Sequence, residues 1–544
     1  MPNPKRPDEA AFKEEYASLN AAQKKAVDSI EGPVMVIAGP GTGKTTILAL
    51  RIANILRLTD TPPSGILAIT YTDAGVKAMR KKLAHLIGTR AHEVHIHTFH
   101  GFAAAMMAEY QDHFLHVTDR RTMTDVEQES ILRELIATPA YRELRPSGKP
   151  DAYIGALIRA ISDAKRDALL SEDVRTFARA EMGRIKSDED SISTRGKTKG
   201  QLKASAEESL KKCERTLLFA DVYAEYEERK TANLLMDFND LIIEFLTALK
   251  TDELLLRLIQ ERFLYILVDE HQDTNDAQNF IVEMLADFFD TPNVFIVGDE
   301  KQAIYRFQGA SVENFLSLQK RWPNMEVISL ETNYRSHQDI LDAAFSMIEN
   351  NYDEGEHQEL RVPLVAGRDE KRRPIDIVTG ENTAAIEKYL IDEIRALEKR
   401  EPKASIAVIT RRNRELERVL RVLESAGIAV SSERSVDIFT HPIGAAFFDL
   451  LEYLFDPTRV DALSRTMIVG LFGLSLEEAA EYVRHLRSGK PVDLEKKLPG
   501  LAHIRSELSS DGAVGFIVNA CRHSGFLKLV AKDATGISVW RGII

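Results

Sequence analysis

Two neighbouring carboxylates, Asp269 and Glu270, stand at the end of an apolar run that begins at Phe263. A short apolar run of this kind predicts a strand buried in a parallel sheet. Adjacent carboxylates repel each other unless a cation lies beside them. We therefore expect Asp269 to bind Mg²⁺ and Glu270 to orient or deprotonate a water molecule. This chemistry suits hydrolysis of a nucleoside triphosphate, provided that a phosphate-binding loop exists elsewhere in the chain.

A glycine-rich loop upstream provides the phosphate site. It follows a predicted strand, Pro33 to Ile37, and precedes a predicted helix, Ile47 to Leu56; its residues are Ala38, Gly39, Pro40, Gly41, Thr42, Gly43, Lys44, Thr45 and Thr46. Glycines let backbone N–H groups approach phosphate oxygens at a helix N-terminus. In the pattern G-x-x-x-x-G-K-[ST], the lysine contacts the β- and γ-phosphates and the next hydroxyl ligates Mg²⁺. Lys44 and Thr45 fit these roles, although Ala38 replaces the first glycine.

The composition excludes several classes of protein. A length of 544 residues predicts about three or four domains. No apolar run approaches the roughly 20 residues that span a bilayer, and the charged N-terminus does not resemble a secretory signal. Cys213 and Cys521 are the only cysteines, too few for a four-thiolate metal site and typical of the reducing cytoplasm. We expect a cytoplasmic protein without a membrane-spanning segment.

The net charge of −13 is unfavourable for binding nucleic acid with the whole surface. Such binding depends on a local basic groove, so the overall charge does not exclude it. Residues 184–215 are rich in lysine and arginine. A solvated loop explains this basic stretch equally well.

Strand and helix patterns alternate before about residue 103, again from about 234 to 330, and in a third block near 375–426. The predicted strands are Val34–Ala38, Ile66–Thr70, Glu93–His97, Tyr265–Asp269, Asn293–Gly298, Glu326–Leu330, Ile375–Thr379 and Ile406–Thr410. Residues 104–233 and those after 431 show mainly helical periodicity. The alternation predicts a doubly wound α/β fold interrupted by a helical insertion.

Several polar segments follow these predicted strands in a fixed order. They are Leu19–Gln23, the glycine-rich loop, Ile66–Asp73, Thr98–Phe102, Met236–Asp240, Val268–Thr274, Val297–Ala310 and Leu330–Ser336. The ordered set, from about Leu19 to Val430, resembles the superfamily 1A DNA helicases of the UvrD/Rep type. A weaker likeness near residues 456–475 is to the RecB- and AddA-like helicase–nucleases.

The resemblance implies an α/β P-loop NTPase with two RecA-like motor domains, each carrying a helical accessory insertion, the second motor being incomplete. The first motor would comprise residues 1–103 and 234–328, with its insertion at 104–233. The second motor would occupy 329–430, and the truncated start of its accessory domain 431–544. ATP would bind between the motors and single-stranded DNA would lie across them.

The resemblance also assigns roles around ATP residue by residue. Gln23 corresponds to the glutamine that reads adenine, since an amide both donates and accepts, and Tyr334 to the residue that stacks on the base. Gln302 corresponds to the γ-phosphate sensor. Arg335 corresponds to an arginine of the second motor that stabilises the transferred phosphoryl group. Gln302 and Arg335 thus join Glu270 as expected catalytic residues, with ATP and Mg²⁺ as cofactors.

The expected DNA contacts lie in loops and at strand ends. They are Thr70, Tyr71, Thr98, Phe99, His100, Tyr305 and Phe307. Aromatic faces stack on bases without reading their sequence, at about 1–3 kcal/mol per base, whereas Thr70, Thr98 and His100 suit the phosphodiester backbone. Each aromatic ring is also a candidate core residue, and this alternative is strongest for Phe99.

The chain departs from the family pattern in several places. His271 stands where the family usually has an aromatic residue, and Gln308 stands where it commonly has arginine. A Thr-x-His-x-x-Lys-Gly-Leu-Glu motif and a second C-terminal arginine motif have no counterpart before Ile544. We therefore expect a fragment, or a truncated reading frame, of a longer protein.

The expected activity is ATP-dependent unwinding of DNA, or translocation on single-stranded DNA from 3′ to 5′, in DNA repair or recombination. Expected partners are single-stranded DNA and its junctions with double-stranded DNA, and the sequence names no protein partner. Two alternatives stay open. One is the helicase part of a helicase–nuclease, and the other is a nucleotide-gated DNA-binding module without unwinding activity.

Overall fold

The structure is a computed structural model, and it describes residues 9–146, 151–193, 201–302, 318–351, 362–368, 374–430, 441–487, 496, 498–506 and 513–531. The chain divides into two compact units, Met1–Ile375 and Asp376–Ile544. None of the described helices combines the length with the apolar character that a membrane crossing requires.

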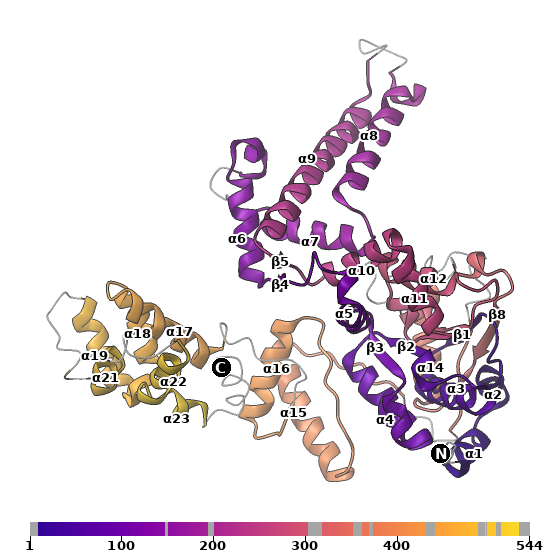
Figure 1. The fold of residues 1–544 in the computed structure, drawn as a ribbon. Coiled ribbons are helices and arrows are strands. Elements are labelled where there is room, and N and C mark those ends of the chain that lie inside the picture. The colour runs from indigo at the N-terminus through magenta and orange to yellow at the C-terminus, as the bar shows by residue number, and fades with distance from the viewer. Residues whose placement is uncertain are drawn as a thin grey trace. The chain divides into compact units, whose positions relative to one another are not determined.

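A six-stranded parallel sheet forms the centre of the first unit (Figure 1). In spatial order its strands are β3 (His95–Thr98), β2 (Ile66–Thr70), β6 (Tyr265–Val268), β7 (Val294–Gly298), β1 (Val34–Ala38) and β8 (Glu326–Leu330). Every residue of β1, β2, β6 and β7 is buried, because both faces of a parallel sheet are covered. The predicted α/β architecture of this region is confirmed.

Successive residues of a strand point to opposite faces of the sheet, so each strand contributes to two cores. Val34 and Val36 belong to one core, and Met35 and Ile37 to the other. The first core is completed by α1 (Glu9–Ala17), α2 (Ala21–Asp28), α3 (Lys44–Leu58) and α4 (Asp73–Ile87). The second is completed by α5 (Phe99–Glu109), α10 (Asp240–Thr251), α11 (Glu253–Arg262) and α12 (Asp276–Ala286). The sheet is therefore doubly wound, as the alternation predicted.

The strand β8 lies at the edge of this sheet. It pairs with β1 along its whole length, from Glu326 opposite Val34 to Leu330 opposite Ala38. Beyond it, β9 (Thr332–Asn333) pairs with β10 (Val365–Ala366), with α14 (Gln338–Ile348) between them in the chain. The boundary expected between residues 328 and 329 thus falls inside β8, and the one between 103 and 104 falls inside α5. The assignment of domains to these ranges stays a prediction.

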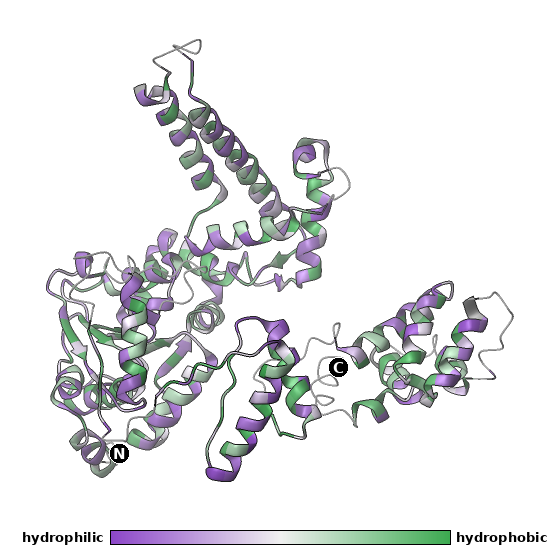
Figure 2. Ribbon diagram, turned by 180° about the vertical axis from the view of Figure 1, so that it is seen from behind, coloured by the Kyte–Doolittle hydropathy of each residue, from purple (hydrophilic) through white to green (hydrophobic). Residues whose placement is uncertain are grey.

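A helical insertion occupies the chain between α5 and α10. Its helices are α6 (Asp125–Ile136), α7 (Ile154–Arg166), α8 (Ser171–Ser187) and α9 (Ala204–Ala232). The short strands β4 (Arg121–Thr122) and β5 (Leu235–Met236), which flank these helices in the chain, pair in parallel. Helices α8 and α9 run side by side and carry hydrophilic and hydrophobic residues along their length (Figure 2). The helical periodicity of this region agrees with the structure.

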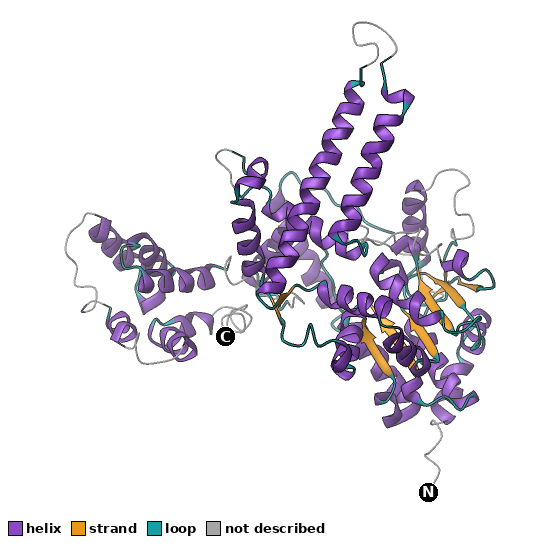
Figure 3. Ribbon diagram, turned by 45° about the horizontal axis from the view of Figure 1, so that its top comes forward, coloured by secondary structure: helices purple, strands orange, loops and turns teal. Residues whose placement is uncertain are grey.

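The described part of the second unit consists of helices joined by turns and loops (Figure 3). Its helices are α15 (Thr383–Arg400), α16 (Asn413–Ser425), α17 (Pro442–Phe455), α18 (Val460–Ile468), α19 (Leu476–Arg487), α21 (Pro499–Ser506), α22 (Ala513–His523) and α23 (Phe526–Val530). Phe447, Leu463 and Phe526 lie in a core that these later helices share. The predicted helical character of this region agrees with the structure.

Two predicted strands are wrong. Residues 375–379 and 406–410 form no strand, although the helices predicted after each of them, α15 and α16, are present. A strand is stable only when neighbouring backbones satisfy its N–H and C=O groups, and no strand of the described residues lies beside either segment. Ile377 and Ile409 are consequently 90% and 92% exposed.

Substituting one buried and one exposed isoleucine tests this placement. Ile296 is fully buried in β7, so Ile296→Ala should lower the free energy of unfolding by about 2–5 kcal/mol through lost burial and a new cavity. Ile377→Ala changes the same atoms at an exposed site and should alter it by less than about 0.5 kcal/mol. Urea unfolding followed by circular dichroism measures both. A similar loss in the two variants would contradict the central position of β7 or the exposure of Ile377.

Candidate functional site

The carboxyl ends of the parallel strands bring the predicted site residues to one edge of the sheet. Strand β1 leads into the glycine-rich loop and β2 into Tyr71, while β3 ends at Thr98. Strands β6 and β7 lead into Asp269 and Asp299. Ligands of open parallel sheets bind in the crevice outside these strand ends. The segments predicted to act together therefore meet because their strands run in the same direction.

The glycine-rich loop has the backbone geometry of a phosphate cradle. Gly41 and Gly43 have φ angles of +71° and +91°, a region that side chains rarely adopt. A Cβ atom at Gly41 would also lie 2.7 Å from the Cβ of Arg335. The hydroxyl of Thr42, fully buried, donates to the carbonyl oxygen of Gly39 at 2.8 Å and closes the loop. Helix α3 begins at Lys44, so its N-terminal N–H groups face the loop.

Lys44 and Glu270 form an ion pair at the centre of the site. The Lys44 Nζ and Glu270 Oε2 atoms are 2.5 Å apart, which joins the phosphate loop to the acidic strand end. Glu270 has a φ of +51°, and a non-glycine residue there costs of order 1–3 kcal/mol, a strain that clusters at functional sites. Phosphate oxygens would compete with Glu270 for the Lys44 ammonium group. The carboxylate is thus placed beside the position where a γ-phosphate would lie.

A chain of hydrogen bonds connects Glu270 to Gln302. The Gln272 amide nitrogen donates to Glu270 Oε2 at 2.8 Å, and its oxygen accepts from the backbone N–H of Asp299 at 2.9 Å. Asp299 Oδ2 in turn accepts from Gln302 Nε2 at 2.6 Å. Sequence reasoning gave Gln272 no role. In the sequence, only an amide side chain within the acidic segment pointed to it. The structure buries this amide, and buried polar groups are nearly always hydrogen-bonded.

The acidic groups of the site suit a divalent cation. Asp269 is 7% exposed, and burial together with Glu270 raises its pKa to about 7. Burial and the charge of Glu270 also raise the pKa of Asp273 to about 6. One lysine thus faces three carboxyl groups, an imbalance that a cation relieves. Asp269 with the Thr45 hydroxyl, in the first turn of α3, offers the hard oxygen ligands that Mg²⁺ prefers.

The residue expected to read adenine is engaged by the protein. Gln23 is 4% exposed, and its amide nitrogen donates to the carbonyl oxygen of Thr42 at 2.8 Å. Its amide oxygen accepts from the backbone N–H of Asn20 at 3.0 Å and completes a capping box at the start of α2. An amide has two hydrogens and two lone pairs, so Gln23 retains capacity for a base. It also fixes the loop backbone.

The segment around Arg335 contacts the phosphate loop directly. The backbone N–H of Tyr334 donates to the carbonyl oxygen of Gly41 at 2.9 Å, and the Asn333 side chain donates to the carbonyl oxygen of Pro40. Asn333, fully buried, also accepts from the backbone N–H of Arg335 at 2.7 Å. Tyr334 and Arg335 are exposed beside the loop, as their predicted roles require. Asn333 is a docking residue that the sequence did not single out.

A cavity of about 240 Å³ lies at the same sheet edge. Its lining contains four predicted DNA contacts, namely Tyr71, Thr98, Phe99 and His100. It also contains Arg166, Phe238, Asn239, Asp273, Asn275 and Gln278, which sequence reasoning did not assign to DNA. The acidic segment reaches both places, because Glu270 lies in the nucleotide site and Asp273 lines the cavity.

The predicted DNA contacts differ in how far they are accessible. Tyr71 and His100 are half-buried. Phe99 is 3% exposed and belongs to the apolar core of the second sheet face, so its ring presents no open face for stacking. Thr70 is 2% exposed, which limits its side chain in the same way. Tyr305 and Phe307 lie outside the described residues.

His100 forms an aromatic stack with Phe238. The two ring centres are 4.0 Å apart with an angle of 23° between the planes. Burial, reinforced by the charge of Arg166, lowers the pKa of His100 to about 4, so the ring is neutral at neutral pH. Phe238 is 63% exposed, although an aromatic side chain gains most from burial. Its segment, Met236–Asp240, stood out in the sequence, but nothing there showed which residue faces the cavity.

Comparisons with known proteins agree with this geometry. The chain matches the family model of the UvrD/REP helicase N-terminal domain over residues 19–323. It matches that of the UvrD-like helicase C-terminal domain over residues 328–478. These families have the P-loop, RecA-like α/β fold that the sequence predicted, and the phosphate loop and parallel sheet described above are its central parts.

Curated relatives are similar over part of their length. The ATP-dependent DNA helicase PcrA of Staphylococcus epidermidis is 31% identical over 334 residues, which are 61% of this chain and 40% of that protein. The protein of the same name from Staphylococcus aureus is 29% identical over 333 residues, with the same shares. The chain spans about 40% of the length of these curated relatives. Because the N-terminal family model alone covers more than half of the chain, this protein belongs to the UvrD/REP helicase family.

Proposed function

We propose that this chain supplies the ATP-hydrolysing motor of a DNA helicase or translocase. The observation that carries the proposal is the course of the acidic segment after β6. Glu270 pairs with Lys44 at the phosphate loop, and three residues later Asp273 lines the cavity that holds Tyr71 and His100. If this short segment moved on hydrolysis, Asp273 would move with it and the lining of the cavity would change. The relatives named as ATP-dependent DNA helicases support the same activity.

The residues of the nucleotide site have separate roles in ATP hydrolysis. Backbone N–H groups of the loop and the Lys44 ammonium group bind the phosphates. Thr45 and Asp269 would hold Mg²⁺, which would neutralise charge on the phosphoryl oxygens. Glu270 orients the attacking water and accepts its proton. Arg335 is exposed next to the loop, where a planar guanidinium stabilises the transition state. The hydrogen-bond chain from Glu270 makes Gln302 responsive to the γ-phosphate.

The cavity suits single-stranded DNA read without sequence preference. Phe238 offers an exposed ring face, Tyr71 a partly exposed one, and Arg166 a cation for a phosphate. Stacking of this kind accepts every base, and phosphate contacts make binding dependent on salt. We further propose movement from 3′ to 5′ and use of junctions between single- and double-stranded DNA, both from the family resemblance. DNA repair or recombination is the process that this activity serves.

We propose the cytoplasm as the location of the protein. Cys213 and Cys521 are both buried and unpaired, the state that a reducing compartment maintains. Burial raises the pKa of the Cys521 thiol to about 12, so this thiol is inert and its role is structural.

Nucleotide binding is tested by adding one methyl group to a glycine. Gly41→Ala should weaken binding of a fluorescent ATP analogue at least tenfold, because its φ of +71° is strained for alanine and its Cβ would press on Arg335. Gly88→Ala is the matched control, since Gly88 has a φ of +64° and no atom within 4 Å of the added Cβ. It should cost a similar amount of stability without changing affinity. Equal affinities in the two variants would contradict the assigned loop.

Hydrolysis is tested at Glu270 in the protein that contains this chain. Glu270→Gln should lower DNA-stimulated ATP turnover at least about 100-fold, because the water loses its base. Its affinity for ATP should be retained or increased, since Lys44 loses a competing partner. Glu261→Gln, at an exposed position of α11, should leave both quantities unchanged. Turnover at the parental rate in Glu270→Gln would remove Glu270 from the reaction.

DNA binding is tested at Tyr71. Tyr71→Ala should weaken binding of a fluorescent single strand roughly tenfold, whatever its base sequence, because one stacking surface is lost. Tyr153→Ala removes a tyrosine ring that is 45% exposed in the insertion and should have no such effect. Fluorescence anisotropy at two salt concentrations measures the affinities. If both variants bind as the parent does, and Tyr71→Ala remains folded, DNA does not lie in this cavity.

A further inference from the structure

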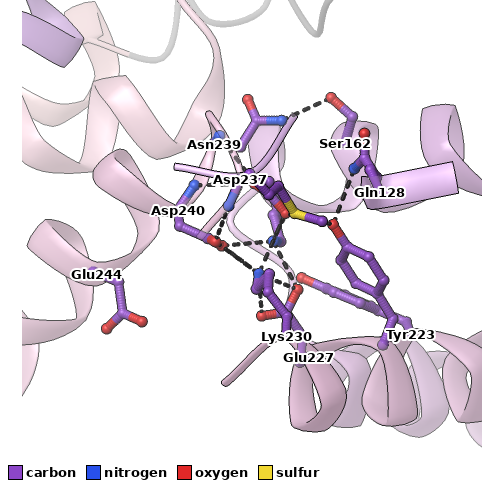
Figure 4. Close-up of polar contacts among 12 residues, drawn as sticks. Gln128, Ser162, Tyr223, Glu227, Lys230, Asp237, Asn239, Asp240 and Glu244 are labelled. Carbon is purple, nitrogen blue, oxygen red and sulfur yellow. Dashed lines mark hydrogen bonds and ion pairs between the residues drawn. The ribbon is translucent and has the colours of Figure 1, made fainter. Parts of the chain in front are cut away.

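A buried network of charges lies where the helical insertion meets the motor (Figure 4). It contains Lys165 of α7, Lys230 and the partly exposed Glu227 of α9, Asp237 just before α10, and Asp240 at the first residue of α10. The two lysine side chains are each 1% exposed. Lysine is almost never buried so completely unless it is paired, so the network is a specific feature of this junction.

Each ammonium group binds all three carboxylates. Lys165 Nζ lies 2.5 Å from Asp237, 2.6 Å from Asp240 and 2.7 Å from Glu227. Lys230 Nζ lies 2.7 Å from Glu227, 2.7 Å from Asp240 and 3.3 Å from Asp237. Burial opposes the charge on Asp237, but the two lysines outweigh this and lower its pKa to about 2. Asp237 is therefore ionised at neutral pH.

The two aspartates also hold the backbone turn that carries Phe238. Asp240 Oδ2 accepts from the backbone N–H of Asp237 at 2.6 Å. Asp237 Oδ1 accepts from the backbone N–H groups of Asn239 and Asp240 at 3.0 and 3.2 Å. Phe238 is the one residue of this turn whose large side chain is exposed. Because the ring is largely exposed, its position depends on the turn and on the stack with His100.

Glu227 takes part in the network in a different way. It binds both lysines, as the aspartates do, but it lies on α9, outside the turn. The network thus has two carboxylates that hold the turn and a third, outside the turn, that meets the same ammonium groups. Comparing Glu227 with the two aspartates therefore separates an effect on the geometry of the turn from an effect on the stability of the fold.

Neither stability nor metal binding accounts for the network. Replacing a buried ion pair by apolar residues of similar volume is often neutral or stabilising, so such pairs are weak evidence for stability. Glu227, Asp237 and Asp240 have ligand atoms within 4.8 Å of one another, a spacing compatible with a cation. The ammonium groups of Lys165 and Lys230 already occupy that position at 2.5–3.3 Å.

We propose that Lys165 and Lys230, with Asp237 and Asp240, form a positioning device for DNA binding, which holds Phe238 against His100 at the cavity through the Asp237–Asp240 turn. The proposal rests on the proposed function of that cavity. Arg166, the residue that follows Lys165 on α7, lines this cavity and an adjoining cavity of about 240 Å³ at the base of the insertion. Asn239 adds a further tie, since its amide donates to Ser162 of α7 at 2.8 Å. The insertion thereby sets the shape of a site that belongs to the motor.

Three variants that each remove one negative charge test the proposal. Asp237→Asn and Asp240→Asn loosen the tie between the turn and the lysines, because an amide NH2 group replaces a carboxylate oxygen that meets the ammonium groups. Glu227→Gln removes the same charge from the same lysines at a residue outside the turn. Each leaves two carboxylates with two ammonium groups, so the buried charge is balanced in all three. We expect Asp237→Asn and Asp240→Asn to weaken single-strand binding roughly tenfold, the loss of one stacking contact. We expect Glu227→Gln to bind DNA as the parent does.

Combination with Phe238→Ala separates positioning from general damage. If the network acts through Phe238, adding Asp237→Asn to Phe238→Ala should cause no further loss of DNA affinity, because coupled residues are not additive. Affinity for a fluorescent ATP analogue should stay at the parental value throughout. If Asp237→Asn does not fold, Asp240→Asn is read by the same criteria.

The outcomes distinguish this inference from the function on which it rests. Equal DNA affinities in Asp237→Asn, Asp240→Asn and Glu227→Gln would overturn the positioning role, as would losses that add to that of Phe238→Ala. Parental affinity in Phe238→Ala itself would instead overturn the assignment of the cavity to DNA. A loss confined to the two aspartate variants, and absent when Phe238 is already alanine, would support the proposal.

Discussion

The common direction of β6, β7 and β1 is the constraint on which the site depends. These neighbouring strands end at one edge of the sheet, so loops that are more than 200 residues apart in the chain, such as those of Lys44 and Glu270, come within contact distance. A one-residue shift in the register of a buried strand would turn its side chains to the wrong face. The burial of both faces therefore secures the ion pair at the strand ends. The fold holds this site by packing before any ligand adds to it.

At the same edge of the sheet, the residues that follow β8 contact the phosphate loop. Asn333 and Tyr334 contact Pro40 and Gly41 through a side chain and a backbone N–H. Because β8 pairs with β1 next to this loop, the segment that follows it has little freedom in where it lies. Arg335 thus owes its position beside the phosphate loop to strand pairing and to a buried asparagine. Its own side chain contributes the charge and not the docking.

Much of the first unit was predictable from sequence, and the reasons are physical. Strands buried on both faces leave apolar runs in the sequence, and a phosphate loop needs glycines at fixed spacing. For this reason β1, β6 and the loop around Gly43 could be predicted. Gln272 and Asn333 were not, because a buried amide acts through partners that are distant in the chain. Phe99 looked like Phe238 in sequence terms, since both are aromatic residues in polar segments. Only the structure shows that Phe99 is in the core and Phe238 is exposed.

The strands predicted at 375–379 and 406–410 failed because apolar content without a neighbouring strand does not make a sheet.

The 29 residues of α9 give the insertion a mechanical property. At about 1.5 Å per residue the helix is roughly 44 Å long, and Lys230 lies only two residues from its C-terminal end at Ala232. The buried lysine therefore lies close to the end about which this long helix would pivot. A sideways movement of several ångströms at Ala204 would shift atoms near Lys230 by roughly a tenth as much if the helix pivots at this end. Such an arm converts a large displacement under a weak force at its tip into a small displacement under a strong force at the turn that carries Phe238.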